Sequence, residues 1–442
     1  MSNPRYVAFK ALIKIEEEKA YSNLTLDSAL KNAEMSPLDK AFASSVFYGV
    51  LEKKITLDYI ISRFSKIKPK KIDLKTLVIL RMALYQLAFM DKVPASAAVN
   101  EAVKICKKEK LYQSSGFVNA LLRNAAKSDL LTVLPSPKDQ IRFLSVKYSC
   151  PEKIIKLWIS DYNKTVAEGI LKALDGKPPV YVRVNTLKTN TAELSEKLSS
   201  GGISAVTVNG LSNALEIRSF GSLSDNEQYK QGLFYVQDLS SQICCEILNA
   251  KPGDIVSDVC SAPGGKSFTS AQNMCGQGAV YSYDIYPHKL KLIENTAARL
   301  GIDNIKVSLR DALSDIPLNN SDKIICDVPC SGLGVLRRKP EIRYKDDTGI
   351  DSLPDIQLKI LENTAKYLKS GGVLVYSTCT LHNDENSGVV NRFLAEHKDF
   401  VPYPITLPQG IKRTINEPEY MLTLFPQTNN TDGFFICTIK KR

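Results

Sequence analysis

The stretch Asp258-Val-Cys-Ser-Ala-Pro-Gly-Gly-Lys-Ser267 decides the fold of the C-terminal half of this chain. Residues 254–258 have the apolar character of a short buried strand that begins after Gly253. Residues 266–274 have helical spacing and are followed by Gly276. A strand that enters a helix through a glycine-rich turn presents backbone N–H groups and the positive end of the helix at one edge of a sheet. Nucleotide-like cofactors bind at such an edge.

Four interpretations of this loop are open. A P-loop would need a glycine five residues before Gly265, where the chain has Cys260. A dinucleotide fold would need Gly-x-Gly-x-x-Gly, and the loop has only Gly264-Gly265. An S-adenosylmethionine-dependent methyltransferase would need an acid about twenty residues later to bind the ribose, and Asp284 ends the predicted strand 279–284. An ordinary strand-to-helix connection is the alternative without a function.

Composition limits the class of protein. A chain of 442 residues is expected to fold as two or three domains. The formal net charge of +11 favours a polyanionic partner. Residues 1–10 lack the apolar core of a signal peptide, and residues 77–90 are too few and too polar for a bilayer span. The 10 cysteines have no disulfide-like spacing, so we expect a protein of the reducing cytoplasm.

Three domains are predicted along the chain. Residues 1–132 are expected to be helical, because apolar residues recur there at three- and four-residue spacing. Residues 139–231 mix short helices and strands, which predicts a small α+β module for RNA recognition. Residues 232–442 alternate strand and helix, which is typical of a doubly wound α/β domain with a parallel sheet.

The pattern within each domain predicts its individual elements. The helices expected in the first domain are residues 7–18, 25–32, 40–53, 57–62, 74–89, 95–107 and 116–127. In the second domain we expect helices at 154–162 and 191–199 and strands at 180–184, 205–208 and 215–217. A capped helix at 236–243 should open the third domain, and its later strands should be 279–283, 305–308, 323–326, 373–376 and 434–439.

Four stretches of the first domain are informative beyond their periodicity. Tyr48-Gly-Val-Leu-Glu-Lys-Lys54, Arg81-Met-Ala-Leu-Tyr-Gln-Leu87, Val93-Pro-Ala-Ser-Ala-Ala-Val-Asn-Glu-Ala-Val103 and Gly116-Phe-Val-Asn-Ala-Leu-Leu-Arg123 resemble the NusB-type helical RNA-binding domain. Basic residues gather between the helices, at 66–71 for example. They are expected to hold a nucleic-acid backbone, and a solvated surface is the alternative.

Two cysteines follow neighbouring strands of the third domain. Asp327-Val-Pro-Cys330 comes after the predicted strand 323–326, and Tyr376-Ser-Thr-Cys379 closes the predicted strand 373–376. Parallel neighbours in a sheet lie about 4.8 Å apart, so the two loops should meet beside the cofactor loop. Two thiols and one carboxylate would then converge.

A thiol at this position has a chemical reason. Carbon 5 of a pyrimidine is too weak a nucleophile to attack a sulfonium methyl group. A thiolate that adds to carbon 6 creates an enamine whose carbon 5 can attack, after which the carbon 5 proton and the sulfur must both leave. Methylation of a ring amine needs no thiol. The residues by themselves leave open whether Cys330 or Cys379 is the attacking thiol.

Structural roles are the alternative for the cysteines. The members with apolar or strand neighbours are expected to fill the core: Cys244, Cys245, Cys275, Cys326 and Cys437. We expect no metal, because no second cysteine pair lies near Cys326 and Cys330 and the chain has 3 histidines. A disulfide between Cys330 and Cys379 is geometrically possible, but a reducing compartment argues against it as the resting state.

The loops together resemble a known family. Asp258-Val-Cys-Ser-Ala-Pro-Gly-Gly-Lys-Ser267, Asp327-Val-Pro-Cys-Ser-Gly-Leu-Gly334 and Tyr376-Ser-Thr-Cys-Thr-Leu381 are similar to loops of the Sun (Fmu, RsmB-type) family of RNA cytosine-C5 methyltransferases, and Arg183-Val-Asn-Thr-Leu-Lys188 also resembles a family signature. A NusB-like N-terminal domain fits the same family. The departures, such as Val259 and Ser261 in place of alanines, remove no functional group.

The resemblance implies a role for each loop residue. Cys379 would be the nucleophile, Cys330 would assist breakdown of the adduct, Asp327 would contact the cytosine and Lys266 would fix the catalytic turn. The residues implied to bind S-adenosylmethionine are Cys260, Ser261, Ala262, Pro263, Gly264, Gly265, Lys266, Asp284 (ribose), Asp311 (adenine) and Asp327.

The sequence thus predicts a 16S rRNA cytosine-C5 methyltransferase that uses S-adenosyl-L-methionine and a covalent Cys379 adduct. We expect an extruded cytosine of small-subunit ribosomal RNA as substrate, phosphate contacts from residues 336–345, a monomer and no membrane. The alternatives are a non-catalytic RNA-binding or ribosome assembly factor and a C5 methyltransferase of another RNA such as tRNA.

Overall fold

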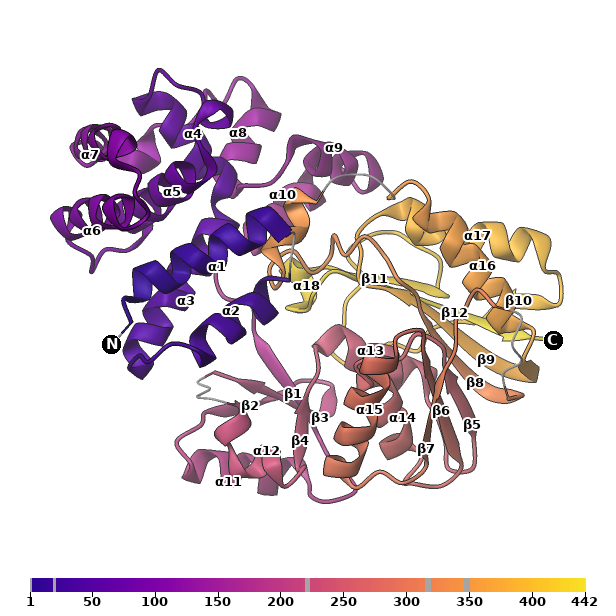
Figure 1. The fold of residues 1–442 in the computed structure, drawn as a ribbon. Coiled ribbons are helices and arrows are strands. Elements are labelled where there is room, and N and C mark those ends of the chain that lie inside the picture. Colours follow the sequence, from indigo (N-terminus) through magenta and orange to yellow (C-terminus); the bar gives the residue numbers. More distant parts are fainter. Residues whose placement is uncertain (1, 19–20, 219–222, 315–318, 346–349) are drawn as a thin grey trace. The chain divides into compact units, whose positions relative to one another are not determined.

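The computed structural model describes residues 2–18, 21–218, 223–314, 319–345 and 350–442 (Figure 1). The chain divides into two units, of which the first comprises Met1–Gly176 with Leu336–Asp346 and the second Lys177–Val335 with Asp347–Arg442. This division falls after Gly176. The three domain ranges that the sequence suggests therefore stay predictions.

The first unit is built from helices, and those within residues 4–132 surround one apolar core. Its elements are α1 (Pro4–Glu18), α2 (Ser22–Lys31), α3 (Pro37–Glu52), α4 (Lys54–Phe64), η1 (Pro69–Lys71), α5 (Leu74–Phe89), α6 (Ala95–Lys108), α7 (Tyr112–Ala125), η2 (Leu130–Thr132), α8 (Gln140–Tyr148), α9 (Glu152–Asp161), α10 (Lys164–Ala173) and η4 (Pro340–Tyr344). Helix α5 is buried along most of its length, and Asp73 caps it by accepting from the backbone N–H of Thr76 at 2.9 Å. The predicted helices all form, and α8 and α10 are additional to them.

Arg343 corrects the prediction that residues 336–345 contact RNA phosphates. Its side chain is 2% exposed and lies inside the first unit. Its Nη1 donates to the carbonyl oxygens of Glu52, Tyr148 and Ser149 at 3.1, 3.3 and 3.1 Å. A guanidinium that donates to three backbone carbonyls inside the fold is not available to bind a phosphate. The prediction is therefore wrong for Arg343, which is a structural residue.

A small antiparallel sheet begins the second unit. Its strands are β1 (Val180–Val184), β2 (Ala205–Val208), β3 (Leu211–Ile217) and β4 (Phe234–Val236) in the order β2-β3-β1-β4, accompanied by α11 (Thr191–Ser200), η3 (Leu223–Asp225) and α12 (Glu227–Lys230). The predicted helix 236–243 is wrong at its start. Val236 pairs with Val182 in the sheet, and α13 (Leu239–Leu248) begins only after Asp238, whose carboxylate accepts from the N–H of Ser240.

The large sheet of the second unit has the strand order β10-β12-β9-β8-β5-β6-β7, and β11 pairs with β12. The strands are β5 (Ile255–Asp258), β6 (Ala279–Asp284), β7 (Ile305–Leu309), β8 (Ser321–Asp327), β9 (Leu368–Thr378), β10 (Phe400–Pro402), β11 (Met421–Leu424) and β12 (Phe434–Lys441). Strands β5 to β9 are parallel, as predicted. The prediction of a wholly parallel sheet fails at β10, β11 and β12, which pair antiparallel.

Helices cover both faces of this sheet (Figure 1). They are α14 (Gly265–Asn273), α15 (Pro287–Leu300), α16 (Leu353–Ala365) and α17 (Ser387–Glu396), and the short η5 (Asn383–Glu385) and α18 (Pro426–Asn429) lie in connections. Ile325 of β8 packs into the core under α13, α14 and α15, whereas its neighbours Ile324 and Cys326 pack under α16 and α17. Because both faces of β8 are buried here, apolar residues stand at the successive positions 324–326. The architecture is the predicted Rossmann-like one.

Arg183 and Asn185 join the small sheet to the α/β sheet. Arg183 is 1% exposed and donates to Glu246 of α13 at 2.7 Å. The side-chain amide of Asn185 is fully buried and donates to the carbonyl oxygens of Gly232 and Leu300 at 2.8 and 2.7 Å. The family signature that contains both residues therefore has a structural purpose, which is to fix the small sheet to the methyltransferase-like sheet.

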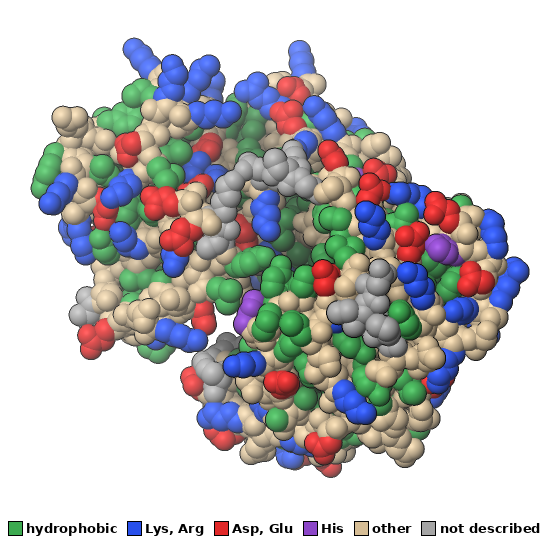
Figure 2. All heavy atoms as spheres, turned by 45° about the vertical axis from the view of Figure 1, so that its right-hand side comes forward, with side chains coloured by type: hydrophobic (Ala, Val, Ile, Leu, Met, Phe, Trp, Pro, Cys, Tyr) green, Lys and Arg blue, Asp and Glu red, His purple; other side chains and the backbone are tan. Residues whose placement is uncertain are grey.

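Figure 2 shows Lys and Arg side chains spread over the visible face, with Asp and Glu side chains between them. The net charge of +11 is thus not gathered into one patch on this face. In the part of the chain that the structure describes, none of the helices combines the length and the apolar character that crossing a bilayer requires.

Substitution of Asn185 tests the connection between the two sheets. We expect Asn185→Ala to lower the free energy of unfolding by about 3 kcal/mol, because two buried carbonyl groups lose their donor. Urea unfolding followed by circular dichroism measures this change. The exposed Asn320 provides the control, and Asn320→Ala should leave the unfolding midpoint unchanged. Equal midpoints for both variants would contradict the structural role.

Candidate active site

The glycine-rich turn after β5 is tied to the end of β6. Ser261 donates from its backbone N–H and from its Oγ to the carbonyl oxygen of Tyr283 at 2.8 and 2.9 Å. Gly264 has a φ of +103°, and a Cβ there would lie 2.5 Å from the ring of Phe268. Only glycine fits this turn, which directs the chain from β5 into α14.

A cavity of about 190 Å³ lies against this turn. Its lining comprises Val236, Gln237, Asp238, Ser241, Asp258, Cys260, Ser261, Ala262, Pro263, Gly265, Lys266 and Asp327. The structure thus brings together most of the residues that the resemblance assigns to the cofactor. Sequence reasoning missed Gln237 and Asp238, which it placed in a helix, although their position just before α13 follows from the Asp238 cap.

Asp284 lies next to the turn, and neither Asp284 nor Asp311 is among the described residues that line the cavity. Asp284 ends β6, and its Oδ2 accepts from the N–H of Ala262 at 3.2 Å, while Oδ1 accepts from Tyr286 at 3.1 Å. Asp311 follows β7, and its Oδ1 accepts from the N–H of Leu313 at 2.9 Å. Both acids therefore follow or end the successive strands β6 and β7, of which β6 is the neighbour of β5.

Asp258 is a buried carboxylate at the floor of the cavity. Its side chain is 1% exposed, and Oδ2 accepts from the hydroxyl of Ser267 at 2.7 Å. Oδ1 has no hydrogen-bond partner among the described residues. Burial raises the pKa of Asp258 to about 7, against the hydrogen bond from Ser267, which lowers it. From the sequence, Asp258 was predicted only to end a strand. The structure adds it to the residues of the site.

Lys266 and Asp327 form an ion pair between the turn and the end of β8. Nζ of Lys266 lies 2.6 Å from Oδ2 of Asp327, and the two side chains are 9% and 27% exposed. The hydroxyl of Ser377 on β9 donates to the other carboxylate oxygen at 2.7 Å. Burial lowers the pKa of Lys266, but the charge of Asp327 outweighs it, so this pKa lies above its ordinary value. Lys266 is therefore held charged.

The thiols of Cys330 and Cys379 lie 3.2 Å apart. Both cysteines are half-buried and belong to no disulfide, and they follow the adjacent strands β8 and β9 as predicted. The hydrogen bond to Cys379, together with burial, raises the pKa of Cys330 well above its ordinary value.

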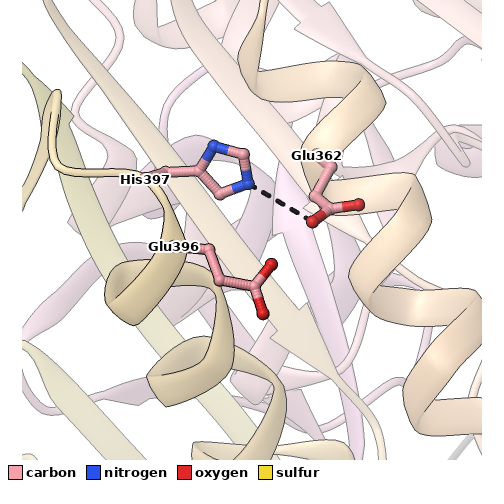
Figure 3. A group of neighbouring side chains, drawn as sticks. All are labelled: Glu362, Glu396 and His397. Atoms are coloured by element: carbon pink, nitrogen blue, oxygen red, sulfur yellow. Dashed lines mark hydrogen bonds and ion pairs between the residues drawn. The ribbon is translucent and has the colours of Figure 1, made fainter.

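One group of side chains outside this site has donor atoms that could hold a metal ion. The donor atoms of Glu362, Glu396 and His397 lie within 4.8 Å of one another (Figure 3). His397 Nε2 lies 3.3 Å from a carboxylate oxygen of Glu362, and its ring stacks on Phe393 at 4.5 Å. These contacts join the end of α17 to α16. They account for the group as a helix-to-helix ion pair.

Comparison with known proteins identifies the parts of the chain. A model described as 16S rRNA methyltransferase RsmB/F matches residues 245–440, one of the NusB family matches residues 2–127, and one of an RsmF/B-like ferredoxin-like domain matches residues 150–224. The probable ribosomal RNA small subunit methyltransferase B of Bacillus subtilis (strain 168) is 36% identical over 447 residues, which cover 99% of this chain and 98% of that protein.

Solved structures share the fold. The crystal structure of PH0851 matches with a TM-score of 0.84 and 24% identity, covering 100% of this chain and 99% of that chain. NSun6 from Pyrococcus horikoshii, solved with SFG, matches with a TM-score of 0.60 and 24% identity, covering 66% of this chain and 98% of that chain.

Fold and site together define the class of protein as an S-adenosylmethionine-dependent methyltransferase. Within that class, the chain belongs to the 16S rRNA methyltransferase RsmB/F family, since a relative that is 36% identical matches almost its whole length. The residues present fit the cofactor. The glycine turn leaves backbone room beside the cavity, and the unpartnered Oδ1 of Asp258 offers an acceptor at its floor.

The pKa of Asp258 makes a prediction about stability. A carboxyl whose pKa rises from about 3.9 to about 7 on folding binds its proton more tightly in the folded state. The free energy of unfolding that it contributes therefore falls as pH rises through this interval. We expect Asp258→Asn to gain stability relative to the unsubstituted protein between about pH 4 and about pH 7, at about 1.4 kcal/mol for each tenfold change in proton affinity.

Urea unfolding of both proteins without cofactor, at several pH values, measures this difference. The gain should level off above about pH 7, where Asp258 is ionised in both states. A difference in stability that does not change with pH would show that Asp258 is not protonated near neutrality.

Proposed function

We propose that this protein methylates carbon 5 of a cytosine in 16S small-subunit ribosomal RNA through a covalent adduct with Cys379. The observation that carries the proposal is the pair of thiols at 3.2 Å on two adjacent strand ends. Methylation of a ring nitrogen or an exocyclic amine gives no chemical use for two such thiols. Addition to carbon 6 and later elimination uses both.

Cys379 is the attacking group in this proposal. Its thiolate adds to carbon 6, and the electrons of the carbon 5–carbon 6 double bond move so that carbon 5 becomes nucleophilic. The resemblance of the Cys379 loop to the Sun family supports this order, in which Cys330 retains its proton while Cys379 attacks. After methyl transfer, a base removes the proton from carbon 5, the double bond re-forms, and the carbon–sulfur bond breaks to return the thiolate.

Cys330 assists the last of these steps. At 3.2 Å from Cys379 its S–H can donate to the departing thiolate, which stabilises the charge that develops there. Loss of the Cys330 thiol should therefore slow elimination more than addition. This division assigns the two thiols to different steps of one reaction.

Asp327 and Lys266 orient the base. The Asp327 carboxylate accepts from Lys266 and Ser377, and its remaining lone pairs are available to the exocyclic amine of a cytosine. Lys266 keeps the Asp327 carboxylate in place through the ion pair of 2.6 Å. S-adenosylmethionine, held by residues 260–266 with Asp258, Asp284 and Asp311, supplies an electrophilic methyl group when bound.

The substrate is RNA whose cytosine leaves the helical stack, since both reacting carbons are covered by stacked neighbours in a helix. The basic composition of the chain and its NusB-family region support RNA as the partner. The relative from Bacillus subtilis is a probable small-subunit methyltransferase, which supports 16S rRNA. We further propose that the protein acts as a monomer in the cytoplasm.

Substitution of each cysteine tests the order of the thiols. Cys379→Ala should lose methylation of 16S rRNA by a factor of roughly a thousand or more and form no adduct, because no carbon 6 nucleophile remains. Cys330→Ala should accumulate a covalent protein–RNA adduct that survives denaturing electrophoresis. An adduct that accumulates in Cys379→Ala and disappears when Cys330 is also replaced would reverse the assignment.

Tritium release tests the carbon that is methylated. Ribosomal RNA that carries tritium at carbon 5 of cytosine should release one tritium for each methyl group transferred, since only substitution at carbon 5 loses that proton. Methylation without tritium release would mean that another atom is the acceptor. The variant Cys379→Ala is the control and should release none.

A further inference from the structure

Glu385 is a buried carboxylate that the reaction described above does not use. Its side chain is fully buried on η5, six residues beyond Cys379. Burial of a charged group is costly unless its oxygens are hydrogen-bonded. Burial raises the pKa of Glu385, but hydrogen bonds from His382, Ser331 and Gln357 outweigh this, and the pKa lies below its ordinary value.

The hydrogen bonds of Glu385 reach the residue next to Cys330. Its Oε2 accepts from the backbone N–H of Ser331 at 2.9 Å, and its Oε1 accepts from the hydroxyl of Ser331 at 2.5 Å. The amide of Gln357 donates to the same Oε2 at 2.9 Å and to the carbonyl oxygen of Pro329 at 2.9 Å. The residues on both sides of Cys330 are thus fixed by one carboxylate and its amide partner.

The loop of Cys379 is attached to the same group. The hydroxyl of Thr380 lies 2.7 Å from that of Ser331, which donates to Glu385 and so has a lone pair left to accept. Tyr376 donates to the carbonyl oxygen of Glu385 at 2.6 Å. Glu385 therefore connects the ends of β8 and β9 below the two thiols.

Cys379 has further supports that do not depend on the Glu385 carboxylate. The side chain of Asn386 accepts from the hydroxyl of Thr378 at 2.6 Å and donates to the carbonyl oxygen of Thr380 at 3.1 Å. The N–H of Gly334 donates to the carbonyl oxygen of Cys379 at 3.0 Å. Removal of the carboxylate should therefore displace Cys330 more than Cys379.

We propose that Glu385 is a positioning residue that holds Cys330 against Cys379 for the elimination step. This inference rests on the proposed function, because it needs Cys379 as the nucleophile and Cys330 as the assisting thiol. Without the carboxylate, addition and methyl transfer continue, and the adduct breaks down slowly. The loss should resemble that of Cys330→Ala although both thiols are present.

The test compares Glu385→Ala with Glu417→Ala. Glu417 is also a buried glutamate of the second unit, 7% exposed at its side chain, and it accepts from the N–H and hydroxyl of Thr423 at 2.8 Å each. The variant Glu417→Ala therefore measures the effect on kcat and on the adduct of losing a buried, hydrogen-bonded carboxylate that is not attached to either cysteine loop. Both variants are to be matched for folded fraction by circular dichroism before the kinetics are measured.

In Glu385→Ala we expect a lower kcat by a factor of roughly ten to a hundred, the size of effect that a misplaced group produces, with an unchanged KM for RNA. The steady-state fraction of enzyme in covalent adduct with 16S rRNA should rise above that of Glu417→Ala. Glu385→Gln should restore much of kcat, because its amide oxygen still accepts from Ser331 N–H and its NH₂ can donate to the Ser331 hydroxyl. Equal kcat and equal adduct in the two alanine variants would overturn the proposal.

Comparison with other variants separates a failure of the Glu385 proposal from a failure of the proposed function. Should Glu385→Ala not fold, Ser331→Ala removes only one hydroxyl of the same group and should raise the adduct fraction in the same direction, and no change in adduct there contradicts the proposal. Adduct that forms without Cys379 sinks the proposed function itself. Adduct that is trapped by Cys330→Ala but not by Glu385→Ala or Ser331→Ala would contradict only the role of Glu385.

Discussion

The ion pair between Lys266 and Asp327 is the interaction on which the arrangement of the site depends. Lys266 begins α14 and Asp327 ends β8, while Ser377 of β9 donates to the second oxygen of the same carboxylate. One side chain therefore fixes the ends of β5, β8 and β9 relative to one another. A buried pair of this kind adds little net stability, since desolvation offsets its attraction. Its value lies in the geometry that it imposes on three loops.

Two carboxylates in this site have opposite environments. Asp327 accepts from a charged donor, Lys266, whereas Oδ1 of Asp258 has no partner among the described residues. Burial outweighs the hydrogen bond from Ser267, so the pKa of Asp258 rises to about 7. Pairs of acids whose surroundings separate them in this way take different tasks. In the proposed function, Asp327 contacts the cytosine and Asp258 contacts the cofactor beside the glycine-rich turn.

The local pattern of the sequence accounts for most of the fold. The five parallel strands were predictable because each carries apolar or aromatic residues, and three of them, β5, β6 and β8, end at an aspartate. The antiparallel strands β10 and β11 were not, since they are short and carry no signal of their direction. The burial of Arg343 could not be predicted either. Its partners lie up to 291 residues away, and a charged side chain at a loop normally indicates solvent.

Residues of the site could be predicted from the sequence only where the reaction requires a particular residue type. Paired cysteines at strand ends suggest a reaction, so Cys330 and Cys379 were found. Glu385 carries no such signal, because a glutamate at this position is indistinguishable in sequence from a surface acid such as Asp384, whose side chain is 81% exposed. Its importance arises from Ser331, a neighbour 54 positions away that only the parallel register of β8 and β9 brings close.

Adjacent parallel strands explain why two thiols can cooperate here without forming one rigid unit. Cys330 and Cys379 belong to loops that share the Glu385 carboxylate through Ser331 and Thr380, and Asn386 gives the Cys379 loop a support of its own. A nucleophile must keep its place through addition and elimination, whereas an assisting thiol acts only when the leaving sulfur gains charge. The additional support from Asn386 therefore belongs to the thiol that must stay in place throughout. The 3.2 Å contact is then a property of the sheet register, and each loop contributes one of the two steps.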